Sequence, residues 1–229
     1  MYLPRHFEET RPEVLHTLLR QHPLGLLITL DEHGAPVANA IPFMLDAERG
    51  EFGTLVGHVA RANPVWRQPD NTQKAQQVLV VFQGPEGYIS PSGYASKALH
   101  GKVVPTWNYA MVQARGPLRV LDDEAATLAL VTRLTQHHEA KLPKPWAVAD
   151  APADYIQSLL RAIVCIEIPL TSLVGKYKLS QNRDAADQAG VLAALNAAEK
   201  TERLTRDESA QPASSELAQW MQQHGGASA

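Results

Sequence analysis

Hydrophobic and polar residues alternate with different periods along the chain, and these periods predict its elements. Near the N-terminus the spacing is helical, with apolar residues at Val14, Leu15, Leu18 and Leu19. A capping box formed by Thr10 and Glu13 precedes this pattern, and Pro23 follows it. We therefore expect a first helix between Thr10 and Pro23.

Runs of apolar and β-branched residues that are typical of strands follow this helix. The first four runs span residues 24–30, 36–45, 51–59 and 77–82, and later runs span 111–121 and 162–169. A polar, glycine-containing turn at residues 31–34 joins the first two runs, which predicts a β-hairpin. Several strands at about ten-residue spacing, joined by such turns, favour an antiparallel sheet or barrel.

Helical patterns interrupt the strands only in the second half of the chain. Residues 122–124 and Asp154 are predicted to cap two helices, and an alanine-rich helix is expected over residues 184–200. Because helices do not alternate strictly with strands, a doubly wound parallel sheet is disfavoured. The pattern alone therefore predicts an α+β protein built on a β-barrel.

Two segments lie outside this regular pattern. Residues 92–107 form a long polar connection, and such connections in compact domains are often functional. Residues 201–229 form a polar tail, in which Leu217, Trp220 and Met221 can dock as a short helix. The last five residues are small and are expected to fray, so the tail is predicted to be partly flexible.

Composition and charge exclude several classes of protein. With 229 residues, of which 45% are apolar and 20% charged, the chain is not collagen-like, disordered or a coiled coil. It has neither a run of about 18 apolar residues nor a secretory N-terminus, so we expect a cytoplasmic protein with no membrane partner. The net charge of -3 provides no general attraction to DNA phosphates. The single cysteine, Cys165, cannot form an intrachain disulfide and is expected to be buried and inert.

Common nucleotide-binding and hydrolase motifs are missing from the sequence. It contains no G-x-G-x-x-G, P-loop, H-E-x-x-H or G-x-S-x-G pattern. His137 and His138 lie at the end of a predicted helix, where histidine interacts favourably with the helix dipole. Because adjacent residues of a helix point apart, we expect no metal site there.

The segment from Gly57 to Pro64 is the first candidate site. A strand leads into a turn with His58, Arg61 and Asn63, and these groups can hold a phosphate at a strand-to-helix junction. The alternative is a solvated turn in which Asn63 is an ordinary helix N-cap.

A second candidate site lies at residues 100–109, which combine aromatic, amide and basic groups. Trp107 and Asn108 can stack on a planar ring and form hydrogen bonds with its edge. Alternatively, Trp107 pins this loop into the core or contacts a second subunit.

The third candidate site is the polar segment 176–183, directly before a predicted helix. Lys178, Ser180 and Gln181 provide donors for an anion at a helix N-terminus. Alternatively, Ser180 or Asn182 simply caps the helix.

Five segments of the chain, in this order, resemble the PaiB family of FMN-binding negative transcriptional regulators. They are Met1–Phe7, Gly57–Arg67, Phe82–Ser92, Val104–Tyr109 and Lys178–Arg183. The resemblance covers roughly residues 1–195, and we expect one PaiB-like domain at residues 1–200 followed by the tail. It implies a split β-barrel, an antiparallel Greek-key barrel with peripheral helices, as in pyridoxamine-phosphate oxidases and flavin reductases. It also implies a homodimer with two FMN sites at the subunit interface.

The resemblance further implies which residues bind FMN. Those that act within one chain are Ile41, Pro42, His58, Arg61 and Asn63. Those that reach in from the partner chain are either Trp107 and Asn108 or Lys178 and Gln181. The strand with the first pair would lie along the isoalloxazine ring, and the turn after the next strand would hold the phosphate.

The chain departs from the family pattern at two positions. Ala40 stands where the family commonly has histidine, and Gly93 stands where a tryptophan commonly follows Ser-Pro-Ser. A missing aromatic stack costs about 1 kcal/mol. Weaker FMN binding, or a dimeric scaffold with a degraded pocket, is therefore an alternative.

The resemblance and the residues together leave two classes of function open. The first is a flavin-binding negative transcriptional regulator, a repressor whose DNA contact rests on family analogy, since no helix-turn-helix is evident. The second is an FMN-dependent oxidoreductase or a haem-utilisation protein of the related split-barrel group, in which the cofactor carries the chemistry. No acid–base pair is readable from the sequence, so no catalytic residue is assigned.

Overall fold

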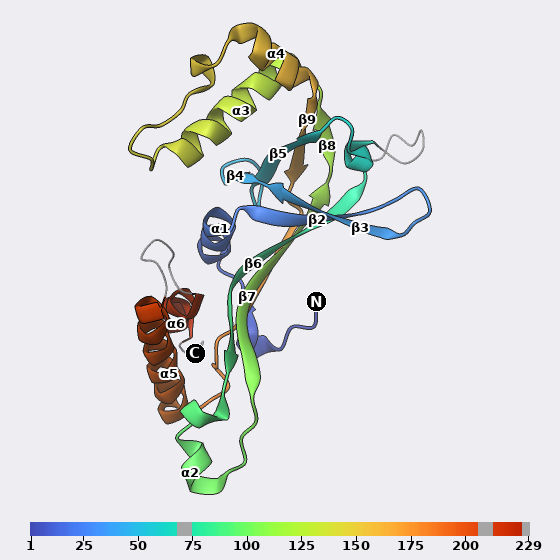
Figure 1. Ribbon diagram of the computed structural model, residues 1–229. Coiled ribbons are helices and arrows are strands. Elements are labelled where there is room, and N and C mark those ends of the chain that lie inside the picture. The colour runs from blue at the N-terminus through green and yellow to red at the C-terminus, as the bar shows by residue number, and fades with distance from the viewer. Residues whose placement is uncertain (68–74, 206–212, 226–229) are drawn as a thin grey trace. The chain divides into compact units, whose positions relative to one another are not determined.

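The structure, a computed structural model, describes residues 1–67, 75–205 and 213–225, with side chains described outside residues 201–214. Figure 1 labels the helices and strands, and the chain forms two compact units. Unit 1 comprises Met1–Leu15, Gln83–Val112 and Val174–Ala229, and unit 2 comprises His16–Phe82 and Gln113–Leu173. Helix α1 (Pro12–Gln21) has the predicted position and includes residues of both units.

The predicted hairpin is confirmed in unit 2. Strand β2 (Leu24–Leu30) pairs along its whole length with β3 (Pro36–Pro42), antiparallel, and its other edge pairs with β6 (Gln77–Ile89). In the turn, the Asp31 carboxylate accepts hydrogen bonds from two backbone N–H groups, and Gly34 adopts a φ of 79°. Glycine reaches this left-handed conformation without the steric cost that a side chain would impose.

A second antiparallel sheet lies in unit 2, with the strand order β4-β5-β9-β8. Its strands are β4 (Met44–Asp46), β5 (Thr54–Ala60), β8 (Arg119–Leu121) and β9 (Ile163–Pro169). Helix α3 (Glu124–Glu139) packs on it, since Leu130 and Leu134 form one buried cluster with Val56 and Cys165. Cys165 is buried as predicted, and burial raises the pKa of its thiol.

Several element boundaries differ from the prediction. The expected strand 36–45 is divided into two strands of different sheets: β3 ends at Pro42, opposite the first residue of β2, and β4 pairs with β5. The predicted polar connection 92–107 contains a short helix, α2 (Ser96–His100). Helix α4 (Ala153–Arg161) begins one residue before Asp154, which lies in its first turn rather than at the cap.

Unit 1 is built on a sheet with the order β1-β10-β7-β6. Strand β1 (Glu8–Glu9) pairs with β10 (Ser172–Lys178), antiparallel, and β7 spans Thr106–Pro117. Strands β6 and β7 contribute residues to both units. The sequence reading did not predict β10, whose pattern is diluted by glycine and lysines.

Two C-terminal helices belong to unit 1, namely α5 (Ala185–Thr205) and α6 (Ala213–His224). The predicted docking of α6 is confirmed, because Leu217, Trp220 and Met221 are all buried. The Trp220 ring lies 5.3 Å from the ring of Tyr177 on β10, centroid to centroid. Most of the residues that we expected to fray, 226–229, lie outside the described part of the chain.

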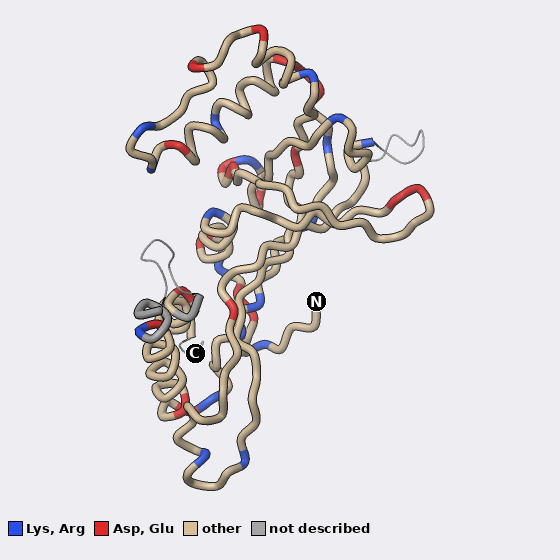
Figure 2. The backbone as a smooth tube through the Cα atoms, viewed as in Figure 1, with Lys and Arg blue, Asp and Glu red and all other residues tan. Residues whose placement is uncertain are grey.

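The remaining short elements are 3-10 helices: η1 (Arg5–Phe7), η2 (Pro64–Trp66), η3 (Pro91–Gly93) and η4 (Val148–Asp150). All strand pairs described above are antiparallel, and the helices lie mainly in the second half of the chain, so the α+β class is confirmed. Among the described residues, no helix has the length and hydropathy to cross a membrane. Lys and Arg are interspersed with Asp and Glu along the chain (Figure 2). The expected division into residues 1–200 and a tail stays a prediction.

Candidate functional site

The turn that follows β5 is held in place by Asn63. Its side-chain oxygen accepts a hydrogen bond from the Val65 N–H at 3.0 Å, which makes Asn63 the N-cap of η2. Its amide nitrogen donates to the side-chain oxygen of Asn39 on β3 at 2.9 Å. The capping interpretation of Asn63 is therefore confirmed, and the same residue links the turn to β3.

Arg61 lies in the same turn, and its guanidinium already has partners. It donates to both carboxylate oxygens of Asp122, at 2.7 and 3.2 Å, and to the carbonyls of Arg161 and Ile163. The ion pair raises the pKa of Arg61 and lowers the pKa of Asp122. A phosphate bound by Arg61 would have to replace Asp122, so the phosphate role of Arg61 stays a prediction.

Strand β3 and strand β5 approach each other closely at the predicted ring-binding residues. A Cβ atom added at Gly57 would lie 3.0 Å from the carbonyl oxygen of Pro42, so only glycine fits here without displacing a neighbour. Ile41 is buried and Pro42 is exposed. Among the described residues, β3 has a strand partner only in β2, so its other edge leaves backbone N–H and C=O groups unpaired by a ladder.

His58 lies on the opposite face of β5 from Gly57, because successive strand residues alternate. Its register partner on β9 is Cys165, on the face that α3 covers. The Nδ1 atom of His58 is buried without a hydrogen-bond partner, and burial lowers the pKa of the imidazole. The structure thus places a neutral imidazole with an unpaired nitrogen beneath α3, directed away from Pro42.

The four other predicted residues lie together in unit 1, and two of them have structural roles. The buried Asn108 donates from its side-chain nitrogen to the Ser180 hydroxyl at 2.8 Å. Gln181 accepts from the Leu179 N–H at 2.7 Å and donates to the carbonyl of Tyr177 at 2.6 Å. These bonds hold the chain between β10 and α5.

For this segment the alternative prediction, that Ser180 or Asn182 caps the following helix, names the wrong residues. Asp184, rather than Ser180 or Asn182, accepts a hydrogen bond from the N–H three residues on, that of Asp187, at 2.8 Å. This is the geometry of an N-cap for α5. Ser180 instead has a φ of 71°, a left-handed conformation that its buried hydrogen bond to Asn108 helps to hold.

Trp107 and Lys178 are the other two predicted residues of unit 1; Trp107 is exposed and Lys178 is partly buried. The Trp107 side chain is 53% exposed and makes an edge contact with Tyr88, which is 54% exposed, at a centroid distance of 6.1 Å. It is therefore not pinned into the core of its unit. Lys178 donates to the Thr106 hydroxyl and to the Trp107 carbonyl, and burial lowers the pKa of its ammonium.

The departure from the family pattern at Gly93 has a packing reason. A Cβ atom on Gly190 of α5 would lie 1.9 Å from the carbonyl oxygen of Gly93, so the two backbones meet at a pair of glycines. The next residue, Tyr94, is buried, and the guanidinium of Arg183 lies 4.5 Å from its ring centroid. In this chain the segment therefore supports α5.

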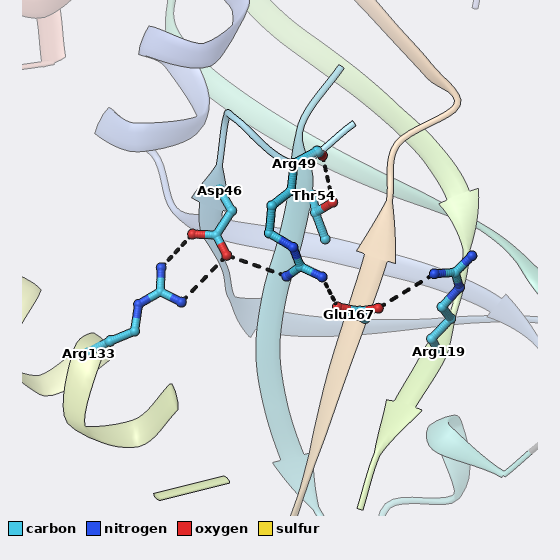
Figure 3. Close-up of polar contacts among 6 residues, drawn as sticks. All are labelled: Asp46, Arg49, Thr54, Arg119, Arg133 and Glu167. Atoms are coloured by element: carbon cyan, nitrogen blue, oxygen red, sulfur yellow. Dashed lines mark hydrogen bonds and ion pairs between the residues drawn. The ribbon is translucent and has the colours of Figure 1, made fainter. Parts of the chain in front are cut away.

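The sequence reading missed a network of alternating charges in unit 2 (Figure 3). Arg133 of α3 pairs with Asp46 of β4, which also lies 3.5 Å from Arg49. Arg49 pairs with Glu167 of β9 at 2.5 Å, and Glu167 lies 3.7 Å from Arg119 of β8. Apart from Asp46 and Arg49, which are three positions apart, the members are far apart in sequence, so no local pattern reveals the network. Each carboxylate is paired, which indicates a structural role.

The described part of the chain contains no group of three or more His, Cys, Asp or Glu side chains that could hold a metal ion. In unit 2, the edge of β3 away from β2 has no strand partner among the described residues, and in unit 1 Trp107 is exposed and Lys178 is partly buried. Taken separately, unpaired backbone groups suit the polar edge of the FMN ring, an aromatic side chain suits its flat face, and an ammonium suits its phosphate. Each unit therefore offers groups of a kind that FMN binds.

A family model and two relatives match most of this chain in sequence. The model of a family described as "Putative FMN-binding domain" matches residues 1–172. An uncharacterized protein of Emericella nidulans is 34% identical over 84% of this chain and 89% of its own. The protease synthase and sporulation protein PAI 2 of Bacillus subtilis is 31% identical over 85% of this chain and 89% of its own.

Solved structures share the fold at lower sequence identity. The FAD and heme binding protein from Mycobacterium smegmatis has a TM-score of 0.57 at 18% identity, covering 80% of this chain and 78% of that one. The flavocytochrome Anf3 from Azotobacter vinelandii has a TM-score of 0.52 at 15% identity, covering 82% and 78%. The predicted split-barrel fold class is thereby confirmed.

Proposed function

The chain belongs to the FMN-binding family whose model covers its first 172 residues, and from this premise we propose that it is a homodimeric flavoprotein and a negative transcriptional regulator of the PaiB type. FMN is its cofactor, and when bound it supplies a ring that accepts and donates electrons. The dimer, the binding residues and the regulatory role are the proposed parts.

An uncovered apolar sheet face in unit 2 carries the proposal of a dimer. Leu24, Leu26 and Leu30 project from one side of β2 and are 62%, 40% and 54% exposed. The register partners of β2 on this face are also apolar; they are Pro36, Ala38, Ala40 and Pro42. Soluble monomers rarely expose a continuous apolar patch of this kind.

A second copy of the chain is the partner that fits this face. A twofold dimer brings the same patch of both subunits together, so an apolar patch meets an apolar patch. Ala40, where the family commonly has histidine, adds no polar group to the face. The other face of β2 is already used inside the unit, since Leu27 and Thr29 are buried.

The open edge of β3 supports the proposed position of the flavin ring. Its backbone groups near Ile41 and Pro42 can bind the polar edge of the ring without a side chain. Their role here is to orient the ring. The turn with Asn63 is fixed to the same strand through Asn39, so strand and turn form one preorganised element.

The regulatory role is supported by relatives alone. The Bacillus subtilis relative is named a protease synthase and sporulation protein, and the family resemblance points to negative regulation of transcription. The interspersed charges and the net charge of -3 favour regulation through a partner or through flavin state over direct DNA contact.

The cofactor is tested by the visible spectrum of the purified protein after gel filtration. We expect a flavin band that co-elutes with the protein; a colourless protein that does not take up added FMN would contradict the proposal. A Soret band would instead indicate haem. Bleaching of the flavin by NADH or NADPH would favour an oxidoreductase.

The ion pair between Arg61 and Asp122 allows a test of the proposed phosphate role of Arg61 with two variants, one at each partner. If Arg61 exchanges Asp122 for the FMN phosphate, Arg61→Ala weakens FMN binding at least tenfold, while Asp122→Asn strengthens it. Equilibrium dialysis measures both. Unchanged affinity in Arg61→Ala would remove the residue from the phosphate site.

The dimer is tested by sedimentation velocity of Leu26→Lys. The wild type is expected to sediment as a dimer and the variant as a monomer, since a charge in the apolar face opposes contact. Leu159→Lys, at a 45% exposed leucine of α4, is the control and should stay dimeric. A wild-type protein that sediments as a monomer would contradict the proposed dimer.

Regulation is tested by comparing transcripts in cells with and without the gene. A repressor predicts a set of transcripts that rises when the gene is deleted and falls when it is restored. An electrophoretic shift assay at stated salt then shows whether the protein contacts those promoters directly. Unchanged transcripts would leave the flavoprotein without a regulatory role.

A further inference from the structure

The segment that joins α3 to α4 in unit 2 begins with a loop at the end of α3 (Figure 1). We call its residues 140–147 the α3–α4 loop, and every one of them is exposed to solvent. Two of them are large and apolar: Leu142 is 51% exposed and Trp146 is 45% exposed. Neither side chain belongs to the core of the unit or to the candidate flavin site.

Hydrogen bonds to one residue at the end of α3 close this loop. The Glu139 carbonyl accepts from the Leu142 N–H at 2.8 Å, and the Glu139 carboxylate accepts from the Trp146 N–H at 2.8 Å. Pro143 and Pro145 lie between these bonds, where each ring fixes a backbone angle and leaves no N–H to be satisfied. The loop therefore holds Leu142 and Trp146 on two limbs that are tethered to the same residue.

A tethered pair of exposed apolar side chains is suited to binding another protein. Association costs less conformational entropy when the contacting groups already have a fixed arrangement. Tryptophan is enriched among the residues that contribute most to protein interfaces, where polar groups surround an apolar centre. Single exposed apolar residues are common on soluble proteins, but here two share one ordered loop.

The charges of the loop indicate which kind of partner fits it. The loop contains two lysines, Lys141 and Lys144, and no acidic residue. Within the part of the chain that the structure describes, neither lysine forms a hydrogen bond or an ion pair. The flanking carboxylates, Glu139 and Asp150, accept hydrogen bonds from backbone N–H groups of the loop instead. Two ammonium groups beside the apolar pair are thus complementary to a partner that carries carboxylates.

Other occupants fit these charges less well. In a twofold dimer the same patch meets itself, so a second copy would bring lysines against lysines. Recognition of anionic lipid typically uses clusters of about 4–8 Lys or Arg. Binding to DNA depends on many phosphate contacts, which two lysines do not supply.

We propose that the α3–α4 loop docks a partner protein through an acidic segment that also carries apolar side chains. Leu142 and Trp146 form the apolar centre of the contact, and the two lysines pair with carboxylates at its rim. The surface shares no residue with the candidate flavin site. The inference requires neither bound FMN, nor the dimer, nor the regulatory role proposed above.

The test begins with a library of random short peptides displayed on phage. The library is selected on the full chain and counter-selected on Trp146→Ser, which keeps only peptides that need the apolar centre. Enriched peptides are synthesised, and fluorescence polarisation measures their binding to the wild type and to the double variant Lys141→Glu, Lys144→Glu. Because the selection never used the lysines, their effect is an independent observation.

Matched controls separate the loop from general effects of charge and exposure. Leu128→Ser changes a leucine of α3 that is 40% exposed. The double variant Lys102→Glu, Lys200→Glu makes the same change of charge at two exposed lysines of unit 1. Circular dichroism checks that each variant keeps its fold.

We expect the enriched peptides to combine acidic and apolar residues. They should bind the variant with both loop lysines replaced about tenfold or more weakly, and both controls as they bind the wild type. Added salt should weaken the binding to the wild type, because it screens the charges at the rim.

The inference is overturned if no peptide is enriched, if the enriched peptides lack acidic residues, or if they bind the loop-lysine variant as tightly as the wild type. Vesicles of phosphatidylcholine with phosphatidylserine, and a duplex DNA, are tested in parallel. Binding of either that is lost in the loop variants, without peptide binding, would assign the loop to that ligand and equally overturn the inference.

Failure here is distinguishable from failure of the proposed function. A protein that retains FMN but enriches no acidic peptide leaves the flavoprotein proposal intact. A colourless protein that binds an acidic peptide through the loop lysines would support the docking surface while the flavin proposal failed.

Discussion

At the scale of single residues, His58 shows how position sets chemistry. Its imidazole lies in the α3-covered part of unit 2 with Nδ1 buried and unpartnered, and burial lowers its pKa from the ordinary value of 6.5. The unfolded chain therefore binds a proton on His58 at a higher pH than the native protein does. Native stability should fall as the pH drops below about 6.5, until the native imidazole is protonated as well.

His58→Gln is predicted to reduce this loss of stability in acid. Between pH 7.5 and pH 5.5 the free energy of unfolding should fall less in the variant than in the wild type, by up to about 1 kcal/mol, because the side chain is only partly buried. Urea unfolding at both pH values measures the difference. His33→Gln, at an exposed histidine, is the control, and equal losses in all three proteins would contradict the prediction.

Residues that act through local bonds are the ones that sequence can reveal. Asn63 before Pro64 has the spacing of an N-cap, and the structure confirms it. The partner of Arg61 could not be predicted, because Asp122 lies 61 positions away and the pairing depends on the tertiary fold. The same applies to Gly93, because its close backbone contact with Gly190 exists only in the folded chain.

At the scale of elements, the charge network ties α3 to the sheet beneath it. Glu167 is the critical member, since its side chain is only 8% exposed and lies between Arg49 and Arg119. Removing a buried carboxylate leaves its cations without a partner, which costs more than the loss of an exposed ion pair.

Glu167→Gln is predicted to lower the free energy of unfolding by about 1–3 kcal/mol. The half-exposed arginines remain hydrated, which keeps the loss below that of a fully buried pair. Chemical denaturation measures it, with Glu32→Gln at an exposed residue as the control, expected within about 0.5 kcal/mol of wild type. A loss no larger than the control's would show that the network is not stabilising.

Helix α6 is predicted to stabilise unit 1 through one leucine above all. Leu217 is fully buried, and a Cβ atom on Gly87 would lie 2.7 Å from its side chain. Leu217→Ala should cost about 2–5 kcal/mol of unfolding free energy, by lost burial and a new cavity. The exposed Gln222→Ala is the control. A loss under 1 kcal/mol in Leu217→Ala would mean that α6 is not part of the cooperative unit.

Elements with a clear period were predictable, and those set by tertiary pairing were not. The alternating run of β2 and the turn at Gly34 specify a hairpin locally. Strand β10 escaped prediction because its place between β1 and β7 compensates for a weak intrinsic pattern. The break after Pro42 differs from the single strand that the pattern predicts over residues 36–45, because the apolar pattern continues across it.

At the scale of the whole molecule, the apolar face of β2 and β3 links folding to assembly. If two copies cover this face, dimerisation stabilises only the native state, so the melting temperature rises with protein concentration. We predict this rise for the wild type and its loss in Leu26→Lys, measured by calorimetry over a hundredfold range of concentration. Leu159→Lys should behave as the wild type, and a wild-type melting temperature independent of concentration would oppose the dimer.

Pattern alone reached the α+β class, and family resemblance reached the split barrel and FMN. Neither could show which candidate side chains already form hydrogen bonds within the protein. Asn108, Gln181 and Arg61 do so with partners that only the folded chain brings close.

The pairing of β1 with β10 has a consequence for how the protein is made. Glu8 lies opposite Lys176, 168 positions later, so β1 cannot pair with β10 until synthesis has reached that strand. At about 5–20 residues per second, a ribosome needs roughly 8–34 s to cover that distance. Unit 2 is contained within residues 16–173, so it can fold before β10, the partner of the first strand, has been completed. The first strand of unit 1 can therefore pair only after all residues of unit 2 have been synthesised.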